Sequence, residues 1–263
     1  MPLPEMTEWS CPVRKADPLR QEHLCCCRRM VDYMNVCWIV GAGDFSPDDL
    51  CELRREDGDV IIAADNGLTY LTQMDMVPDY IIGDYDSLQP EGREGLSSFI
   101  CAHPGRERHL PKEKDDTDTM AAVRWGFELG YAQFRLCGAL GGSRVDHTIA
   151  NLQTLLFIKG RGGRGRIVGT QQELFLVRDE RMVFPPDCRG GFSLFAIDAK
   201  VQVTIRGMKY EGDGLTLTYD FPLGCSNEFL PGQTASVAVC GGTVLAVMDR
   251  QRSSGGQKRN ILV

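Results

Sequence analysis

Two aspartates stand two residues apart directly after a short apolar run, in the stretch GDYDS at 83–87. In an extended backbone, side chains at positions i and i+2 lie on one face, about 7 Å apart. Two carboxylates placed in this way repel each other unless a cation lies between them. Mg²⁺ commonly binds one or two carboxylates together with substrate phosphates. The spacing therefore predicts a magnesium site at Asp84 and Asp86, and helix capping is the alternative interpretation.

A second acidic group, KEKDDTDT at 112–119, precedes a stretch with helical composition. Aspartates complement the dipole of a first helical turn, which explains one or two of them. Three aspartates after two lysines favour more than capping, because the amides of a helix N-terminus bind phosphate and a lysine neutralises it. We therefore expect Lys114, Asp116 and Thr117 to bind phosphate groups, with an aspartate of this group at the Mg²⁺.

A third group, GALGGSRVDH at 138–147, combines glycines with a guanidinium and a carboxylate. Gly141 and Gly142 allow a ligand to approach the backbone closely, and Arg144 offers a planar donor fork for phosphate. Asp146 is a candidate to orient or deprotonate a hydroxyl group, or to join the metal ligands. The alternative is an Arg144–Asp146 pair that holds a turn, with His147 as a surface or capping residue.

A fourth and weaker feature is Asp65-Asn66, which follows the apolar run 60–64 and suits a ribose, a metal ion or simply a turn. The sequence has no Walker-type phosphate loop and no protein-kinase signature. Any nucleotide chemistry must therefore rely on carboxylates, Mg²⁺ and arginine.

The elements that position these groups alternate between strands and helices. Buried parallel strands are predicted at Val36–Val40, Val60–Ala64, Tyr80–Ile82 and Phe134–Cys137. Helices are predicted at Pro47–Glu56, Gly67–Gln73, Pro90–Ile100, Thr117–Leu129 and Ile149–Ile158. This alternation predicts a doubly wound, mainly parallel α/β sheet. Ligands bind outside the carboxyl ends of such strands, so we expect the four polar groups along one edge of the sheet.

Beyond the glycine-rich stretch 160–165, interpreted as a flexible linker rather than a phosphate loop, the pattern changes to short strands with turn signals. These strands are predicted at Glu173–Val177, Phe192–Ala196, Val201–Ile205, Leu215–Tyr219, Ser236–Cys240 and Thr243–Val247. They predict an all-β sandwich or flattened barrel. The expected organisation is an N-terminal extension (1–34), an α/β nucleotide-binding domain (35–160), a β-sandwich domain (166–250) and a flexible tail (251–263).

Composition narrows the function further. Of 263 residues, 43% are hydrophobic and 25% charged, which is typical of a globular protein, and 29 basic against 36 acidic residues give a net charge of −7. The negative charge argues against general nucleic-acid binding, and no apolar run approaches the ~20 residues of a membrane-spanning helix. Eleven cysteines lack Cys-x-x-Cys spacing, which disfavours structural zinc, and no signal peptide is apparent. We expect a cytoplasmic protein that binds neither nucleic acid nor membrane.

Four motifs, GDxDS (83–87), TDxxxA (117–122), GGxRxDH (141–147) and SNEF (226–229), occur in an order that resembles the thiamine pyrophosphokinase (thiamine diphosphokinase) family. The resemblance covers most of the chain from about Val36 to Met248, and Asp146-His147 with Asn151 is more similar to the bacterial branch. It implies an α/β domain followed by a β-sandwich that binds thiamine and dimerises, with active sites between the two subunits of a homodimer. It also implies Mg²⁺-dependent transfer of a pyrophosphoryl group from ATP to the hydroxyethyl oxygen of thiamine, giving thiamine diphosphate and AMP.

The resemblance also implies roles for particular residues. Mg²⁺ ligands are expected at Asp84, Asp86 and Asp118, which form the catalytic set with Arg144 and Asp146. The nucleotide and its phosphates are expected at Asp65, Asn66, Lys114, Asp116, Thr117, Gly141, Gly142 and Arg144. Thiamine is expected at Asp146, His147, Ser226 and Asn227.

Two features depart from the family pattern. Ser143 is inserted in the usual Gly-Gly-Arg-x-Asp loop, and no tryptophan lies near Phe229 to stack on the aminopyrimidine. Two alternatives remain open. A haloacid-dehalogenase-like Mg²⁺-dependent phosphatase would use Asp84 as its nucleophile but leaves the 141–147 loop without a role. A non-catalytic nucleotide or thiamine sensor leaves the intact acidic groups unexplained.

Overall fold

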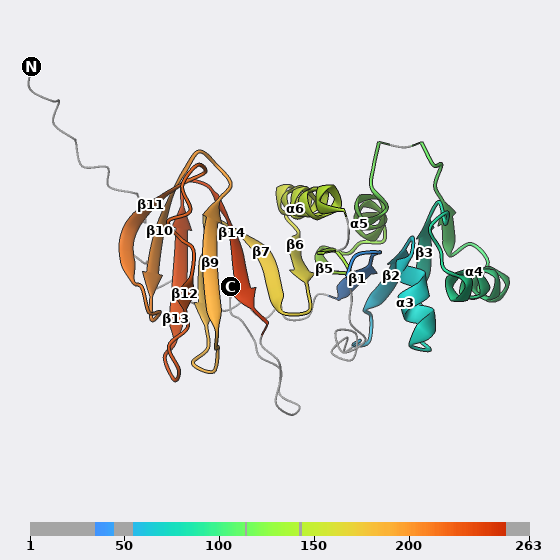
Figure 1. Ribbon diagram of the computed structural model, residues 1–263, viewed down its shortest axis with the longest axis horizontal. Helices are drawn as coiled ribbons and strands as arrows, with labels where there is room; N and C mark the ends of the chain where they lie inside the picture. The colour runs from blue at the N-terminus through green and yellow to red at the C-terminus, as the bar shows by residue number, and fades with distance from the viewer. Residues whose placement is uncertain (1–34, 45–54, 114, 142–143, 251–263) are drawn as a thin grey trace, which may run out of the picture. The chain divides into compact units, whose positions relative to one another are not determined.

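A computed structural model describes residues 35–44, 55–113, 115–141 and 144–250 (Figure 1). Within these ranges, the first part of the chain builds six parallel strands with four helices between them. The strands are β1 (Val36–Val40), β2 (Val60–Ala64), β3 (Tyr80–Gly83), β4 (Glu107–His109), β5 (Gln133–Cys137) and β6 (Arg164–Val168). The helices are α3 (Gly67–Gln73), α4 (Pro90–Ala102), α5 (Asp118–Glu128) and α6 (Val145–Gly160). The spatial order of these strands is β6-β5-β1-β2-β3-β4.

Helices cover both faces of this sheet, because successive strand residues point to opposite sides. In β1, Cys37 and Ile39 pack in one core with α5 and α6, whereas Val40 belongs to a second core with α3 and α4. β2 divides in the same way, with Ile62 in the first core and Ile61 in the second. The predicted doubly wound α/β fold is confirmed.

The second part of the chain is an antiparallel sandwich, as predicted. Its strands are β7 (Gln172–Arg178), β8 (Arg181–Phe184), β9 (Gly191–Ala196), β10 (Lys200–Arg206), β11 (Gly212–Thr218), β12 (Asn227–Glu228), β13 (Ala235–Cys240) and β14 (Thr243–Asp249). One sheet has the order β11-β10-β13-β8 and packs on β9, β14 and β7 of the other. Phe184, Phe192 and Phe229 contact one another edge to face at the centre of the core between the sheets.

The two parts share one continuous sheet. β6 pairs in parallel with β5 and antiparallel with β7, so ten strands run in the order β12-β9-β14-β7-β6-β5-β1-β2-β3-β4. The interpretation of residues 160–165 as a flexible linker is therefore wrong: Arg164 and Gly165 belong to β6 and pair with Gln133 and Phe134. Glycine, which is rare in strands, concealed this strand, because it leaves only two apolar residues, Ile167 and Val168.

Some predictions fall outside the part of the chain that the structure describes. They concern the N-terminal extension (1–34), the tail (251–263) and most of the predicted helix Pro47–Glu56, of which the described residues Arg55 and Glu56 are not helical. Among the described residues, no helix combines the length and apolar character needed to cross a membrane.

Candidate active site

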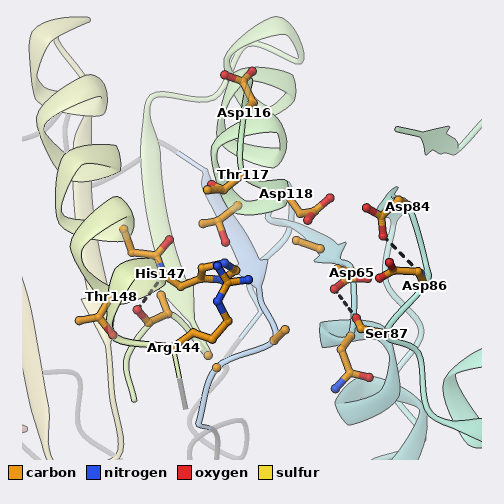
Figure 2. Close-up of a pocket in the computed structure, with 18 of the residues that line it drawn as sticks. Asp65, Asp84, Asp86, Ser87, Asp116, Thr117, Asp118, Arg144, His147 and Thr148 are labelled. Atoms are coloured by element: carbon orange, nitrogen blue, oxygen red, sulfur yellow. Dashed lines mark hydrogen bonds between the residues drawn. The ribbon is translucent and has the colours of Figure 1, made fainter. Parts of the chain in front are cut away.

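A cavity of about 810 Å³ opens at the carboxyl edge of the parallel strands (Figure 2). Its walls come from the ends of β1, β2, β3 and β5 and from the first turns of α5 and α6. The lining residues include Asp65, Asn66, Asp84, Asp86, Ser87, Lys112, Asp116, Thr117, Asp118, Gly141, Arg144, His147, Thr148 and Asn151. Residues far apart in the sequence thus meet in one cleft, since parallel strands present their carboxyl ends at the same edge.

Asp65 carries a carboxylate whose surroundings perturb it. It follows β2 with a left-handed backbone (φ 49°), and its Oδ2 accepts a hydrogen bond from the Ser87 hydroxyl. Its Oδ1 is buried and has no hydrogen-bond partner among the described residues. Burial, together with the charges of Asp118 and Asp84, raises the pKa of Asp65 above its ordinary value, although the Ser87 hydrogen bond opposes the rise. A buried, unpartnered carboxylate oxygen beside two other carboxylates fits a cation.

Asp84 and Asp86 lie in a tight turn and not in the extended backbone expected from their spacing. Tyr85 between them has a left-handed conformation (φ 62°), and the Asp86 amide donates to Oδ1 of Asp84 over 3.2 Å. The Asp86 carboxylate forms an ion pair with Lys112, whose Nζ lies 2.7 Å from Oδ2. A left-handed non-glycine residue costs energy, and such residues cluster at functional sites. In Figure 2 the turn brings both aspartates to the same side of the cleft as Asp65.

The first turn of α5 forms the wall opposite these aspartates. Thr117 caps the helix, with its hydroxyl accepting from the Met120 amide over 3.2 Å, and this fixes Asp118 as the first helical residue. Asp118 points toward Asp65 and Asp84 in Figure 2, whereas Asp116 points away from them and pairs with Arg124. The backbone amides of a helix N-terminus are suited to a phosphate.

Arg144 and Asp146 form a two-fold hydrogen-bonded pair at the start of α6, so the turn-holding alternative describes this arrangement. Nε of Arg144 lies 3.2 Å from Oδ1 of Asp146, and Nη2 contacts Oδ2. Arg144 and His147 line the cavity, whereas Asp146 does not. The hydrogen bond from Arg144 holds the pKa of Asp146 below its ordinary value, which makes this carboxylate a weak base while the pair persists.

Ser226 and Asn227, expected at the thiamine, do not line this cavity. β12, which holds Asn227, is five strand steps from β5 in the sheet order, and at ~4.8 Å per step the separation is about 24 Å. Ser226 is exposed. Asn227, in contrast, is only 5% exposed, and its side chain forms hydrogen bonds within the protein. Its amide donates to the Tyr210 carbonyl and accepts from the Tyr210 and Glu228 amides at 2.8–2.9 Å. Asn227 therefore orients the exposed Tyr210.

The remaining predicted residues lie in different surroundings. Gly141 lines the cavity with a left-handed backbone (φ 70°), while Lys114 and Gly142 lie outside the described residues. Phe229 is buried in the sandwich core and is unavailable for stacking on a ligand. Sequence reasoning missed Lys112 as a cleft residue, although its place in KEKDDTDT was a signal.

No three His, Cys, Asp or Glu side chains within the described ranges lie close enough to form a ready-made metal centre. The carboxylates instead surround an open cleft, so a Mg²⁺ held there must take further ligands from a bound phosphate or from water. That is the usual manner of Mg²⁺ binding in nucleotide sites.

An open α/β sheet with carboxylates and two helix N-termini around one cleft defines a class of protein: an enzyme that acts on phosphate groups. Comparison with family models identifies the enzyme family. The model of the thiamin pyrophosphokinase catalytic domain matches residues 52–162, and that of the thiamin pyrophosphokinase vitamin B1 binding domain matches residues 183–244. Together they cover well over half of the sequence, and the chain belongs to the thiamin pyrophosphokinase family.

Solved structures share the fold of this chain. The chain is similar to thiamin pyrophosphokinase from Geobacillus thermodenitrificans, with 26% identity and a TM-score of 0.69 over 83% of this chain and 99% of that one. Thiamine pyrophosphokinase from Bacillus subtilis shares the fold at 22% identity and a TM-score of 0.72, over 83% and 100% of the two chains. The Candida albicans enzyme shares it at 16% identity and a TM-score of 0.63, over 82% and 90%. A search of curated proteins found no match.

Proposed function

We propose that this protein transfers a pyrophosphoryl group from ATP to the hydroxyethyl oxygen of thiamine, in a reaction that depends on Mg²⁺. The observation that carries the proposal is the joining of Asp65, Asp84, Asp86 and Asp118 in one cleft at the edge of the sheet. Both domain models of the family match the same chain. The matches do not favour the phosphatase or sensor alternatives.

In the reaction, the thiamine hydroxyl oxygen forms a bond to the β-phosphorus of ATP. The bond from that phosphorus to the oxygen bridging to the α-phosphate breaks, and AMP leaves with the electron pair. The hydroxyl proton passes to a base, for which Asp146, beside the cavity and not in its wall in the free protein, is the candidate once Arg144 has turned from it to a phosphate. The low pKa of the paired Asp146 is then relieved, because its largest cause is the Arg144 hydrogen bond.

The cleft residues divide the remaining work. Asp84, Asp86 and Asp118 would hold Mg²⁺, with Asp65 Oδ1 beside them. When bound, the metal neutralises charge that develops on the phosphate oxygens. The amides at the start of α5 and the donor fork of Arg144 bind phosphate oxygens, and the backbone of Gly141 permits a close approach. Catalysis then rests on positioning and electrostatics, as is general for phosphoryl transfer.

The distance of Ser226 from the cleft supports a homodimer in which each site takes residues from both chains. Large apolar side chains are exposed near both half-sites: Val145 (71%) and Ile149 (55%) on the first turns of α6, and Tyr210 (59%) and Phe221 (63%) on the sandwich. Exposed apolar side chains of this kind are typical of interfaces. We propose that a second copy of the chain covers them and brings its Ser226 to the cleft. A cytoplasmic location stays a prediction.

The direct test is incubation of the purified protein with ATP, Mg²⁺ and thiamine, followed by separation of the products. AMP and thiamine diphosphate are expected in equal amounts. ADP with thiamine monophosphate would identify another kind of kinase. Inorganic phosphate released through a phospho-aspartate at Asp84 would identify a phosphatase, and ligand binding without AMP would identify a sensor.

Asp86→Asn tests the metal role. We expect this variant to lose at least about 100-fold in turnover, because a metal ligand is lost, and to keep its melting temperature, because the Asp86–Lys112 pair is exposed. Asp213→Asn is the matched control, since it removes an exposed carboxylate that pairs with Arg206 on the sandwich. Normal turnover of Asp86→Asn at saturating Mg²⁺ contradicts the assignment.

Mixing two inactive variants tests the shared site. Asp86→Asn damages the cleft, and Ser226→Arg places a bulky cation where cationic thiamine is expected. After the subunits exchange, about half of the dimers are mixed and each contains one intact site, so about a quarter of the wild-type activity should return. If each chain held a complete site, the mixture would stay inactive.

A further inference from the structure

Lys112 occupies a position in the cleft that neither the family motifs nor the reaction explains. Its ammonium lies 2.7 Å from Oδ2 of Asp86, and both residues line the cavity. The charge of Asp84 adds to the attraction, and these interactions raise the pKa of Lys112. A proposed metal ligand is thus paired with a protein cation in the free protein.

The surroundings of Lys112 allow it to leave this partner. The side chains of Lys112 and Asp86 are 78% and 48% exposed, and exposed pairs of this kind are held weakly. The backbone two residues earlier is fixed, because the Leu110 amide donates to the Gly83 carbonyl over 2.9 Å. Six residues later α5 begins, and its N-terminus faces the expected phosphates. Along the chain, Lys112 therefore lies between a residue bonded to the end of β3, just before the aspartate turn, and the helix end expected at the phosphates, and a long side chain carries its ammonium.

The excess of negative charge in the cleft explains why a movable cation would be useful there. Among its described lining residues, five aspartates stand against one lysine and one arginine. In the free protein an ammonium lessens the repulsion among these carboxylates. A divalent cation competes for the same oxygen of Asp86, whereas the ATP phosphates it accompanies are themselves partners for an ammonium.

We propose that Lys112 is a positioning residue that exchanges partners: it neutralises Asp86 in the free protein and moves to the phosphates when a metal–nucleotide complex binds. The proposal rests on the nucleotide site of the proposed function. The proposal has opposite consequences for the binding of two ligands. Lys112 weakens the binding of a divalent cation alone, because it competes for Asp86, and it strengthens the binding of the metal–nucleotide complex. An ion pair with only a structural role would neither weaken the binding of the cation nor strengthen the binding of the complex.

The experiment uses the full chain without thiamine. Mn²⁺ alone is titrated with detection of the free ion by electron paramagnetic resonance, and Mg²⁺–ATP binding is measured by calorimetry. For Lys112→Met we expect Mn²⁺ to bind roughly 3- to 10-fold more tightly, and Mg²⁺–ATP roughly 10-fold more weakly, as lost charge-assisted contacts imply. Lys112→Arg keeps the cation, and both of its constants should return toward those of the unaltered chain.

Arg124→Met is the matched control. Arg124 is an exposed cation paired with Asp116 near the same cleft, so its loss changes the net charge equally without freeing a proposed metal ligand. We expect both constants to stay close to those of the unaltered chain. The proposal is overturned if Lys112→Met shifts both constants in one direction or leaves either unchanged, or if Arg124→Met reproduces its pattern.

The test of Lys112 can fail or succeed independently of the test of the proposed function. A chain that binds Mg²⁺–ATP with the expected Lys112 pattern but releases no AMP with thiamine would refute the function and leave the partner exchange standing. A chain that releases AMP but lacks the pattern would refute the partner exchange alone.

Discussion

The surroundings of Asp65 disfavour the ionised form of its carboxyl group. Burial raises its pKa, the charges of Asp118 and Asp84 add to the rise, and the Ser87 hydrogen bond offsets only part of it. An acid whose pKa is higher in the folded than in the unfolded state lowers stability wherever it is ionised. Such a cost is characteristic of a residue retained for function rather than for folding.

Asp65→Asn should therefore stabilise the protein while it weakens Mg²⁺–ATP binding. We expect a gain of roughly 1 kcal/mol in the free energy of unfolding at pH 7, since the neutral amide escapes the desolvation cost and still accepts from Ser87. The gain should shrink as the pH falls through the raised pKa, and vanish below the unfolded-state value near 3.8, where both states bind the proton. Urea denaturation of both proteins over this range measures the difference. A variant less stable than its parent at pH 7 contradicts the account.

At the scale of residues, the sequence predicted which side chains meet but not their geometry. Carboxylates placed after successive strands had to share an edge, and Asp65, Asp84, Asp86 and Asp118 do line one cavity. The left-handed turn at Tyr85 could not be predicted, because tyrosine carries no preference for it. The burial of Asn227 was equally hidden, since SNEF reads as a polar stretch until its contacts with Tyr210 are known.

At the scale of elements, Gly67 sets how closely α3 approaches β1. A Cβ atom on this first helical residue would lie 1.9 Å from the Val40 carbonyl oxygen, which belongs to the backbone and cannot turn aside. Since Asn66 precedes the helix and lines the cavity, the same contact also positions one wall of the site.

Gly67→Ala should be destabilising by about 2 kcal/mol or more, because the strand or the helix must shift to relieve the clash. Gly160→Ala is its control: this last residue of α6 has nothing within 4 Å of the added atom. Alanine there should be neutral or stabilising by up to about 1 kcal/mol. Thermal or urea unfolding of the two variants gives the comparison, and equal effects would contradict the packing argument.

Helices and strands with a clear apolar pattern were predicted correctly, whereas short polar strands were missed. β1, β2 and α3 have the predicted limits, because each combines an apolar run with clear boundaries. β4 reads Glu-Arg-His and β12 reads Asn-Glu, so neither shows the alternation typical of a strand. Such strands form because a neighbouring strand offers its free edge, which is tertiary information absent from the local sequence.

At the scale of the molecule, the sandwich and the α/β part are joined by more than a chain connection. β7 contributes Leu174 and Leu176 to the core that contains α5 and α6, while Phe175 and Val177 enter the core of the sandwich. Arg166 of β6 pairs with Glu173 of β7 over 3.0 Å, and its guanidinium lies 4.5 Å from the centre of the Phe175 ring. The described residues belong to one compact unit.

We therefore expect a single cooperative unfolding transition. Cores that share strands lose their partners together, whereas independent domains would melt separately. Differential scanning calorimetry should give one peak with equal calorimetric and van't Hoff enthalpies per cooperative unit. Urea unfolding followed by tryptophan fluorescence and by far-ultraviolet circular dichroism should give one midpoint. Two separated transitions would restore the picture of two independent domains divided near residue 160.

The position of β14 has a consequence for biosynthesis. It lies between β7 and β9 in the large sheet, yet it follows both of them in the chain. While a ribosome is still translating residues before Asp249, the nascent polypeptide exposes two bare strand edges that only β14 can join. The sandwich cannot close until β14 has left the exit tunnel, and the core that contains α5 and α6 also waits for this strand, because Leu245 of β14 packs in it. During that interval the nascent chain exposes apolar surface and unpaired strand edges, the features that chaperones protect.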